Sequence, residues 1–375
     1  MSERPLRVAM IGQKGYPPVH GGIEKHVAEL VARLAPAGVE VTIYSRPHYS
    51  DAHGPTLLAG VDVRRLASIP TKHFDAISHT VACTVDAVWR GYDILHYHAL
   101  GPGLLSGIPR WVAGRRTVVT VHGLDWQREK WGRVARGILR LGEHACVRLP
   151  DRTIVVSHAL QQHFRERHGA ETVCIPNGVS QPVLRRPRLM SSLGVRKPYI
   201  LFVGRLVPEK GCHLLTGAYA SLPGELRERF SLVIAGDAGF TERYADQLRK
   251  TAGEEVLFTG FVHGEVLDEL YTNAELVVLP STLEGLSIAL LEGMSYGKCC
   301  LVSDIPPNTE AGGDCVPYFS SGDARALTNR MAELLAAPAD RARFGAAARR
   351  RVLKAYSWQE AADATRNVYR TLMAR

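Results

Sequence analysis

The chain has 375 residues, of which 46% are hydrophobic and 22% are charged, and its formal net charge is +9. This length exceeds the roughly 250–300 residues at which a single hydrophobic core stops growing, so we expect two domains. The composition is that of a soluble globular protein. No apolar run reaches the ~18 residues of a transmembrane helix, so the expected location is the cytoplasm.

The distribution of charge indicates the kind of binding partner, and the spacing of the cysteines indicates the state of their thiols. Residues 1–180 contain 22 Lys and Arg against 15 Asp and Glu, whereas the remaining residues are almost balanced. Excess positive charge on one half favours an anionic substrate, a nucleic acid or an acidic membrane surface. The seven cysteines include no C-x-x-C pair, which favours reduced thiols over disulfides or zinc.

The first half of the chain alternates between strand-like and helix-like segments. Residues 6–11 form a continuous apolar run, and a Gly- and Pro-rich loop separates them from a helix with one apolar face. Gly22 stands at the expected start of this helix, where backbone N–H groups can approach a phosphate. Further strands are expected at 39–44, 61–66, 94–97, 117–122 and 153–156. This alternation predicts a doubly wound parallel sheet.

The same alternation restarts after a break. Periodicity disappears over residues 181–198, where Pro, Arg and Ser accumulate as in an interdomain linker. We therefore predict an α/β protein with two Rossmann-like domains, 1–180 and 199–356, that face a central cleft. A final helix is expected at 357–375, because Ser357 and Glu360 form a capping box. The strands of the second domain are expected at 199–204, 231–235, 256–259, 276–279 and 299–303.

Residues 280–294 contain two glutamates at a predicted strand-to-helix junction. Glu284 is expected on the turn and Glu292 inside the helix, so that both carboxylates face one crevice. Phosphate or polyol oxygens suit the backbone N–H groups expected at the helix start, which are those of Gly285, Leu286 and Ser287. A structural interpretation is also open, in which Glu284 caps the helix and Glu292 is solvated.

Basic and imidazole side chains follow two other predicted strands. Arg205 and Lys210 come directly after the strand at 199–204, and a guanidinium near an ammonium is a good receptor for a diphosphate. The alternative is that both are surface salt-bridge partners. His122 ends an apolar strand and is expected to position a ligand by hydrogen bonding, or to be structural, whereas His96 and His98 are expected to be structural.

These motifs occur in the order that is typical of one enzyme family. The E-x7-E pair, the G-R-x4-K-G loop, the H-G pair at His122 and the P-N-G-V segment ending at Val179 resemble retaining GT-B glycosyltransferases, especially family 4, the group 1 glycosyltransferases. The resemblance covers nearly the full chain. It departs from the family at Asp237, where the A-G-D-G-P turn continues as Ala-Gly-Phe.

The resemblance implies a GT-B fold and a reaction. The expected activity is the retaining, metal-independent transfer of a sugar from a nucleotide-diphosphate sugar, such as a UDP- or GDP-sugar, to an acceptor hydroxyl on a natural product, glycan or lipid-linked compound. No cofactor is expected, and the sequence contains no D-x-D pair that would hold a metal. The first domain would hold the acceptor, and the helix at 357–375 would cross back to it.

The resemblance also assigns roles to the site residues. The expected catalytic residues are Glu284, Arg205, Lys210 and His122. The residues expected to bind the sugar donor are Gly22, Arg205, Lys210, Glu284, Gly285, Leu286, Ser287 and Glu292.

Other interpretations remain open at this point. Another GT-B enzyme, such as a nucleotide-sugar epimerase or a phosphorylase, would share the fold, and the basic charge prompts a nucleic-acid-binding protein. A predicted helix over residues 128–140 carries Arg128, Lys130, Arg133, Arg136 and Arg140 among apolar residues. It is interpreted either as a face for peripheral contact with anionic membrane lipid or as a solvated face over a core stripe.

Overall fold

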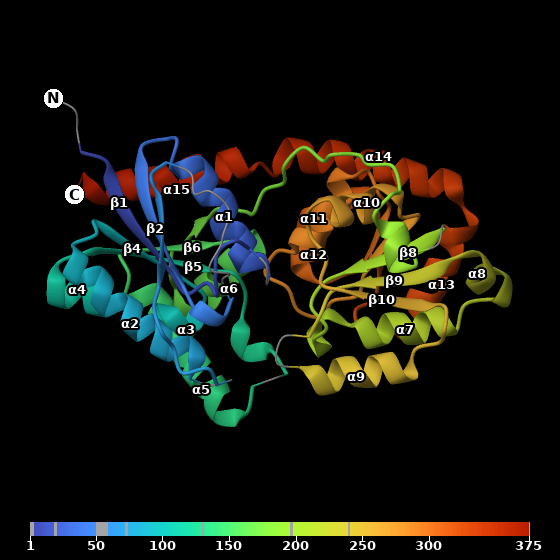
Figure 1. Cartoon of the computed structure of the whole chain (residues 1–375), viewed down its shortest axis with the longest axis horizontal. Coiled ribbons are helices and arrows are strands. Elements are labelled where there is room, and N and C mark those ends of the chain that lie inside the picture. The colour runs from blue at the N-terminus through green and yellow to red at the C-terminus, as the bar shows by residue number, and fades with distance from the viewer. Residues whose placement is uncertain are drawn as a thin grey trace. The chain divides into compact units, whose positions relative to one another are not determined.

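The computed structural model describes residues 4–18, 21–49, 59–71, 74–129, 131–195, 198–238 and 241–374. Their contacts divide the chain into two compact units. Unit 1 comprises Met1–Gly178 together with Trp358–Arg375, and unit 2 comprises Val179–Ser357. Each unit is a parallel sheet with helices on both faces (Figure 1), which confirms the predicted α/β class.

The sheet of unit 1 is doubly wound. Among the described residues it has seven strands in the order β3-β2-β1-β4-β5-β6-β7. The strands are β1 (Leu6–Ile11), β2 (Val39–Ser45), β3 (Val61–Arg65), β4 (Ile94–His98), β5 (Arg116–Val121), β6 (Arg152–Val155) and β7 (Val173–Cys174). Val8 pairs with Val41 on one side and Ile94 on the other, so the strand order reverses beside β1. Ligands of open α/β sheets bind outside the carboxyl ends of strands at such a reversal.

The helices of unit 1 lie in two layers. In Figure 1, α1 and α15 cover one face of the sheet and α2, α3, α4 and α5 cover the other. Their bounds are α1 (Gly22–Leu34), α2 (Asp75–Arg90), α3 (Leu100–Gly103), α4 (Gly107–Ala113), α5 (Arg133–Arg148), α6 (His158–His168) and α15 (Trp358–Met373), with short 3-10 turns η1 (Pro47–Tyr49) and η2 (Asp125–Gln127).

The C-terminal helix α15 is anchored to the body of unit 1. It packs against α1, and its Trp358 and Tyr369 are fully buried. The hydroxyl of Tyr369 lies 2.6 Å from Nδ1 of His96 on β4, and Nε2 of the same imidazole lies 2.7 Å from the Thr120 hydroxyl on β5. His96 therefore ties the helix to the sheet, a structural role that its sequence position suggested.

Unit 2 repeats the architecture. Its described residues form a six-stranded parallel sheet in the order β10-β9-β8-β11-β12-β13, which reverses beside β8. The strands are β8 (Tyr199–Val203), β9 (Ser231–Ala235), β10 (Val256–Gly260), β11 (Leu276–Leu279), β12 (Cys300–Ser303) and β13 (Tyr318–Phe319). β8 and β11 are buried along most of their length because helices cover both faces of the sheet.

The helices of unit 2 fill the intervals between these strands. They are α7 (Cys212–Ala220), α8 (Gly224–Arg229), α9 (Glu242–Thr251), α10 (Gly264–Asn273), α11 (Ile288–Ser295), α12 (Pro306–Gly312), α13 (Ala324–Ala336) and α14 (Pro338–Ala355), with 3-10 turns η3 (Met190–Leu193), η4 (Pro208–Lys210) and η5 (Gly313–Cys315). All seven cysteines are free thiols, as predicted.

Residues 185–190 of the expected linker are hydrogen-bonded to α10. Nε of Arg185 donates to Oδ2 of Asp268 at 3.1 Å. The backbone N–H groups of Arg188 and Met190 both donate to Oε2 of the buried Glu269 at 2.9 Å. These contacts attach the segment to unit 2, because the Glu269 carboxylate accepts hydrogen bonds from the backbone N–H groups of the segment.

Candidate active site

Two loops at the carboxyl ends of β8 and β11 are in direct contact. Gly211 closes the loop after β8 with a φ of +68°, and a Cβ atom built on it would lie 2.1 Å from the carbonyl oxygen of Pro280. The Thr282 N–H donates to the carbonyl oxygen of Glu209 at 2.9 Å. Only glycine permits this approach at position 211, so the two loops form one surface next to the point where the strand order reverses.

Lys210 and Glu284 meet on this surface. Nζ of Lys210 lies 2.5 Å from Oε1 of Glu284, and the two side chains are 20% and 9% exposed. An ammonium group has three donors, so Lys210 can hold the carboxylate and still donate to a ligand oxygen. Arg205 begins the same loop directly after Gly204 and is half-buried. This contact brings together two of the expected site residues, although 74 positions separate them in the chain.

Helix α11 starts later than the sequence suggested. It begins at Ile288, and Ser287 is its N-cap, with the side-chain oxygen accepting from the Leu290 N–H at 3.4 Å. Gly285 and Leu286 lie in the preceding loop, so the expectation that both stand at the helix start is wrong. The serine hydroxyl determines the boundary because it replaces the missing backbone acceptor.

Glu292 lies inside α11, as predicted, and its carboxylate faces α10. The Tyr271 hydroxyl donates to Oε2 of Glu292 at 3.2 Å. The Tyr271 ring stacks on Tyr296, with centroids 5.2 Å apart. The structure thus places Glu284 against Lys210, and Glu292 against a pair of tyrosines.

Gly22 begins α1, as the sequence predicted, but a carboxylate already lies at that end of the helix. Oε1 of Glu24 accepts from the Lys14 N–H at 2.9 Å. Oε2 of Glu24 lies 3.0 Å from a Cβ built on Gly21. Because this negative charge already meets the positive end of the α1 dipole, a phosphate at Gly22 would have to share the site with Glu24.

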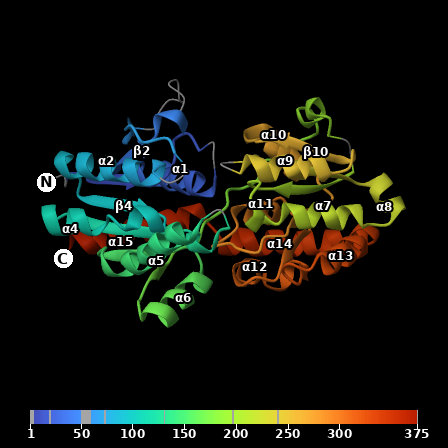
Figure 2. The same ribbon diagram turned by 90° about the horizontal axis from the view of Figure 1, so that it is seen from below.

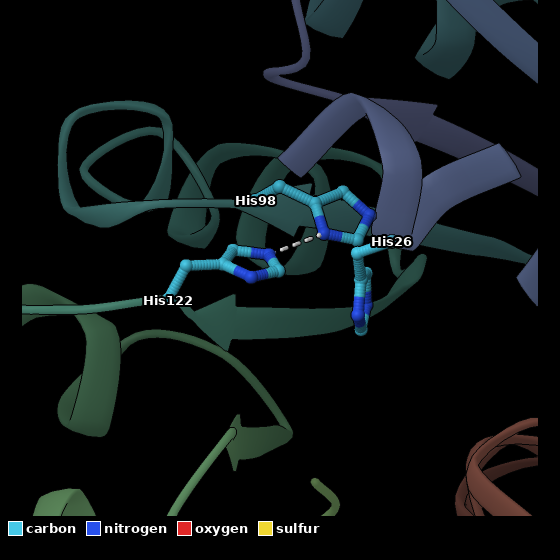
Figure 3. Close-up of side chains that lie close together, drawn as sticks. All are labelled: His26, His98 and His122. Carbon is cyan, nitrogen blue, oxygen red and sulfur yellow. Dashed lines mark hydrogen bonds between the residues drawn. The ribbon is translucent and has the colours of Figure 1, made fainter. Parts of the chain in front are cut away.

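Unit 1 contains a cluster of three imidazoles, shown in Figure 3: His26 from α1, His98 at the end of β4 and His122 just after β5. Nδ1 of His98 lies 3.1 Å from Nε2 of His122. The His26 ring meets the His122 ring edge to face, with centroids 4.6 Å apart. The three rings form a continuous polar group at the carboxyl ends of neighbouring strands.

The imidazoles are neutral at physiological pH. Burial lowers the pKa of His26 to about 4. Burial, together with the neighbouring imidazoles, holds the pKa values of His98 and His122 well below their usual range. A neutral ring has one donor and one acceptor nitrogen, so His122 can hydrogen-bond and orient a ligand.

The two ring nitrogens of His26 differ: one contacts Asn177, and the other is a buried hydrogen-bond acceptor. Its Nδ1 lies 2.7 Å from Oδ1 of Asn177. An amide oxygen only accepts, so Nδ1 carries the proton and Nε2 is an acceptor. Among the described residues, Nε2 is buried without a hydrogen-bond partner. Asn177, which the sequence suggested only as a turn residue, therefore sets the tautomer of His26.

Sequence reasoning missed His26, and it treated His98 as structural. The one available signal was that His98 ends a strand in the same way as His122, and adjacent strand ends meet at one sheet edge. Ligand nitrogens of these three histidines lie within 4.8 Å of one another, so the residue types could hold a metal ion. One pair of these nitrogens already shares the His98–His122 hydrogen bond.

The two doubly wound units define a two-domain α/β protein, and comparison with known proteins identifies its family as one of glycosyltransferases. Residues 188–351 match the family described as glycosyl transferases group 1, and residues 20–181 match glycosyltransferase family 4. The chain belongs to these group 1 glycosyltransferases of GT-B fold. None of its described helices is long and apolar enough to cross a bilayer.

Relatives of known name align over almost the whole chain. The alpha-maltose-1-phosphate synthase of Mycolicibacterium smegmatis is 27% identical, covering 98% of this chain and 100% of that protein. The D-inositol 3-phosphate glycosyltransferase of Streptomyces avermitilis is 28% identical, covering 100% and 89%.

Solved structures share the fold. Sucrose-phosphate synthase from Thermosynechococcus elongatus has a TM-score of 0.84 at 23% identity and covers 98% of this chain and 99% of its own. HepE from Anabaena, solved in complex with UDP-glucose, has a TM-score of 0.79 at 19% identity and covers 99% and 100%.

Proposed function

We propose that this enzyme transfers a sugar from a nucleoside-diphosphate sugar to an acceptor hydroxyl, with retention of configuration and without a metal ion. The observation that carries the proposal is the Lys210–Glu284 pair, held by two touching loops at the carboxyl ends of β8 and β11. A nucleotide-sugar donor is supported by similar structures described as complexes with UDP-glucose and with ADP.

Arg205 and Lys210 would receive the diphosphate. Cleavage of the glycosidic bond places negative charge on the departing diphosphate, and a fixed guanidinium and an ammonium stabilise that charge. The N-terminus of α11 adds its dipole through the N–H groups of Ile288 and Ala289. These groups supply the positive charge that a divalent metal provides in other enzymes, which supports a metal-independent reaction.

The two glutamates would hold the sugar donor at its two ends. Glu284, fixed by Lys210, would accept hydrogen bonds from hydroxyls of the transferred sugar, and Glu292 would accept from the ribose diol. Retention follows if an oxygen of the leaving phosphate takes the acceptor proton on the same face of the sugar. His122, neutral and oriented by His98, would position the sugar by hydrogen bonding.

The test is a thermal-shift panel of UDP-, GDP-, TDP- and ADP-sugars with the purified protein. We expect one donor class to raise the melting temperature of the wild type and of the control variant Lys250→Ala, which changes an exposed lysine on α9. Lys210→Ala should lose most of that shift. A panel without any stabilising nucleotide sugar would contradict the proposal, and release of an epimerised sugar without acceptor would indicate an epimerase instead.

A further inference from the structure

Three neighbouring helices of unit 1 expose large hydrophobic side chains. Trp89 on α2 is 85% exposed, Trp111 on α4 is 69% exposed and Val134 on α5 is 79% exposed. Each belongs to a stripe at helical spacing, and together the stripes form what we call the apolar face: Val81, Val85, Trp89, Ile108, Trp111, Val112, Val134, Ile138 and Leu141. Single exposed hydrophobics are ordinary, but a group of nine on three helices of one layer marks an interaction surface.

The helices of the apolar face belong to one layer. α2 contacts α4 and α3, and α3 in turn contacts α5. Figure 2 views unit 1 from the side of this layer, with α2, α4 and α5 in front of the sheet. The surface therefore extends across several helices.

Helix α5 differs from an ordinary amphipathic helix because large apolar residues of its first half face solvent instead of the core. Its buried residues are Gly142, Glu143, Ala145 and Cys146, all in its second half, whereas Val134, Ile138 and Leu141 are exposed. The interpretation of this helix as a solvated face over a core stripe is therefore wrong. α1 provides the contrast, because its apolar residues Val27, Leu30, Val31 and Leu34 are all buried.

The charge on the same surface is positive. Arg133, Arg136 and Arg140 are interleaved with the apolar residues of α5, and its first carboxylate, Glu143, is buried against His163 and His168. α4 contains Arg110 and no acidic residue. On α2, the carboxylate of Asp86 is held by the Tyr44 hydroxyl and by Arg64 and Arg90. The arginines of α5 thus meet no exposed carboxylate on these three helices.

We propose that the apolar face binds the surface of an anionic lipid bilayer. Exposed tryptophans favour the boundary between headgroups and acyl chains, where the ring is buried and the indole N–H stays hydrated. Valine, isoleucine and leucine side chains enter the same boundary, and arginines pair with lipid phosphates. This mode of binding needs no spanning helix, and it goes beyond the proposed sugar transfer without depending on it.

Vesicle flotation tests the proposal. We expect the protein to float with phosphatidylglycerol-containing vesicles and not with pure phosphatidylcholine vesicles, and added salt should weaken the binding. Arg133→Glu/Arg140→Glu should lower the affinity by about tenfold or more. The matched control Arg325→Glu/Arg343→Glu, on exposed arginines of unit 2, should bind as the wild type does.

A second measurement follows the tryptophans. Phosphatidylglycerol lipids with brominated acyl chains should quench the fluorescence of the wild type, and Trp89→Ser/Trp111→Ser should lose both that quenching and most of the binding. Val183→Ser/Leu184→Ser, at exposed apolar positions of unit 2, is the control. Equal binding of all variants, or no binding to anionic vesicles, would overturn the proposal. Oligomers that become monomers only in the tryptophan variant would assign the face to a second copy and would also overturn it.

Discussion

Nζ of Lys210 lies 2.5 Å from Oε1 of Glu284, although the two residues are 74 positions apart in the chain. The contact depends on β8 and β11 being neighbours in the sheet, so that the loops at their carboxyl ends touch. The pair fixes the carboxylate and leaves ammonium donors for a ligand, and we propose that this ligand is the diphosphate sugar.

Glu284→Gln should lower kcat by about 10²-fold or more, because the neutral amide neither holds Lys210 by charge nor accepts sugar hydroxyls in the same way. Arg205→Ala should have an effect of similar size. Steady-state transfer with the donor found in the thermal-shift panel measures both. Glu242→Gln, which changes an exposed residue of α9, is the control and should retain full activity. Near-normal turnover in either test variant would remove that residue from the mechanism.

Gly211→Ala should disturb the site through the backbone. The left-handed φ and the carbonyl of Pro280 leave no room for a methyl group, so we expect a loss of about 1–3 kcal/mol of unfolding free energy and a displaced loop. Urea denaturation gives the stability. Gly217→Ala on the adjacent helix α7 is the matched control, since its Cβ meets nothing within 4 Å, and it should be neutral or stabilising. Equal stability of the two variants would contradict the close contact between the loops.

Stability should fall as the pH is lowered from about 6.5 towards 5. The pKa of His26 is lowered to about 4 and that of His96 to about 3 by burial, whereas unfolded histidines titrate near 6.5. The unfolded chain therefore binds more protons in this window, and folding loses about 1.4 kcal/mol per pH unit for each group that stays neutral. Denaturation at several pH values measures the slope, and His96→Gln should flatten it. A slope near zero in the wild type would refute the buried neutral state.

Removal of divalent metal should leave transfer unchanged. In the proposed mechanism, the positive charge for the leaving group would come from Arg205, Lys210 and the start of α11. Chelation with EDTA should therefore not alter kcat, and elemental analysis should find no stoichiometric metal. The imidazole cluster of unit 1 makes the experiment informative, because its nitrogens are suitable ligands. Activity that is lost on chelation and restored by one added metal would contradict the metal-independent reaction.

Much of the fold could be predicted from local patterns. Apolar runs and their spacing predicted the strands. Because ligands bind at the carboxyl ends of parallel strands, Lys210 and Glu284 could be expected at one edge of the sheet. The start of α11 was misplaced because Gly285 and Leu286 were expected at the helix start. The local signal was Ser287, a preferred N-cap residue, whose side chain accepts from the Leu290 N–H three positions on.

Two features were not predicted, the histidine cluster and the exposed apolar side of α5, because both depend on tertiary packing that one sequence does not show. His26, His98 and His122 meet only because α1, β4 and β5 are neighbours in the folded unit. The periodicity of α5 shows that Val134, Ile138 and Leu141 share a face, but not that this face points to solvent. The direction of an amphipathic face depends on the neighbouring elements, which are distant in the chain.

Calorimetric titration of the sugar donor tests the central claim most directly, because it measures binding at the Lys210–Glu284 surface without requiring the acceptor. We predict one nucleotide sugar bound per chain by the wild type and by Lys250→Ala, and an affinity lower by about tenfold or more in Lys210→Ala, which lacks the ammonium. Equal affinities in all three proteins would contradict the account, since the diphosphate would then lie elsewhere.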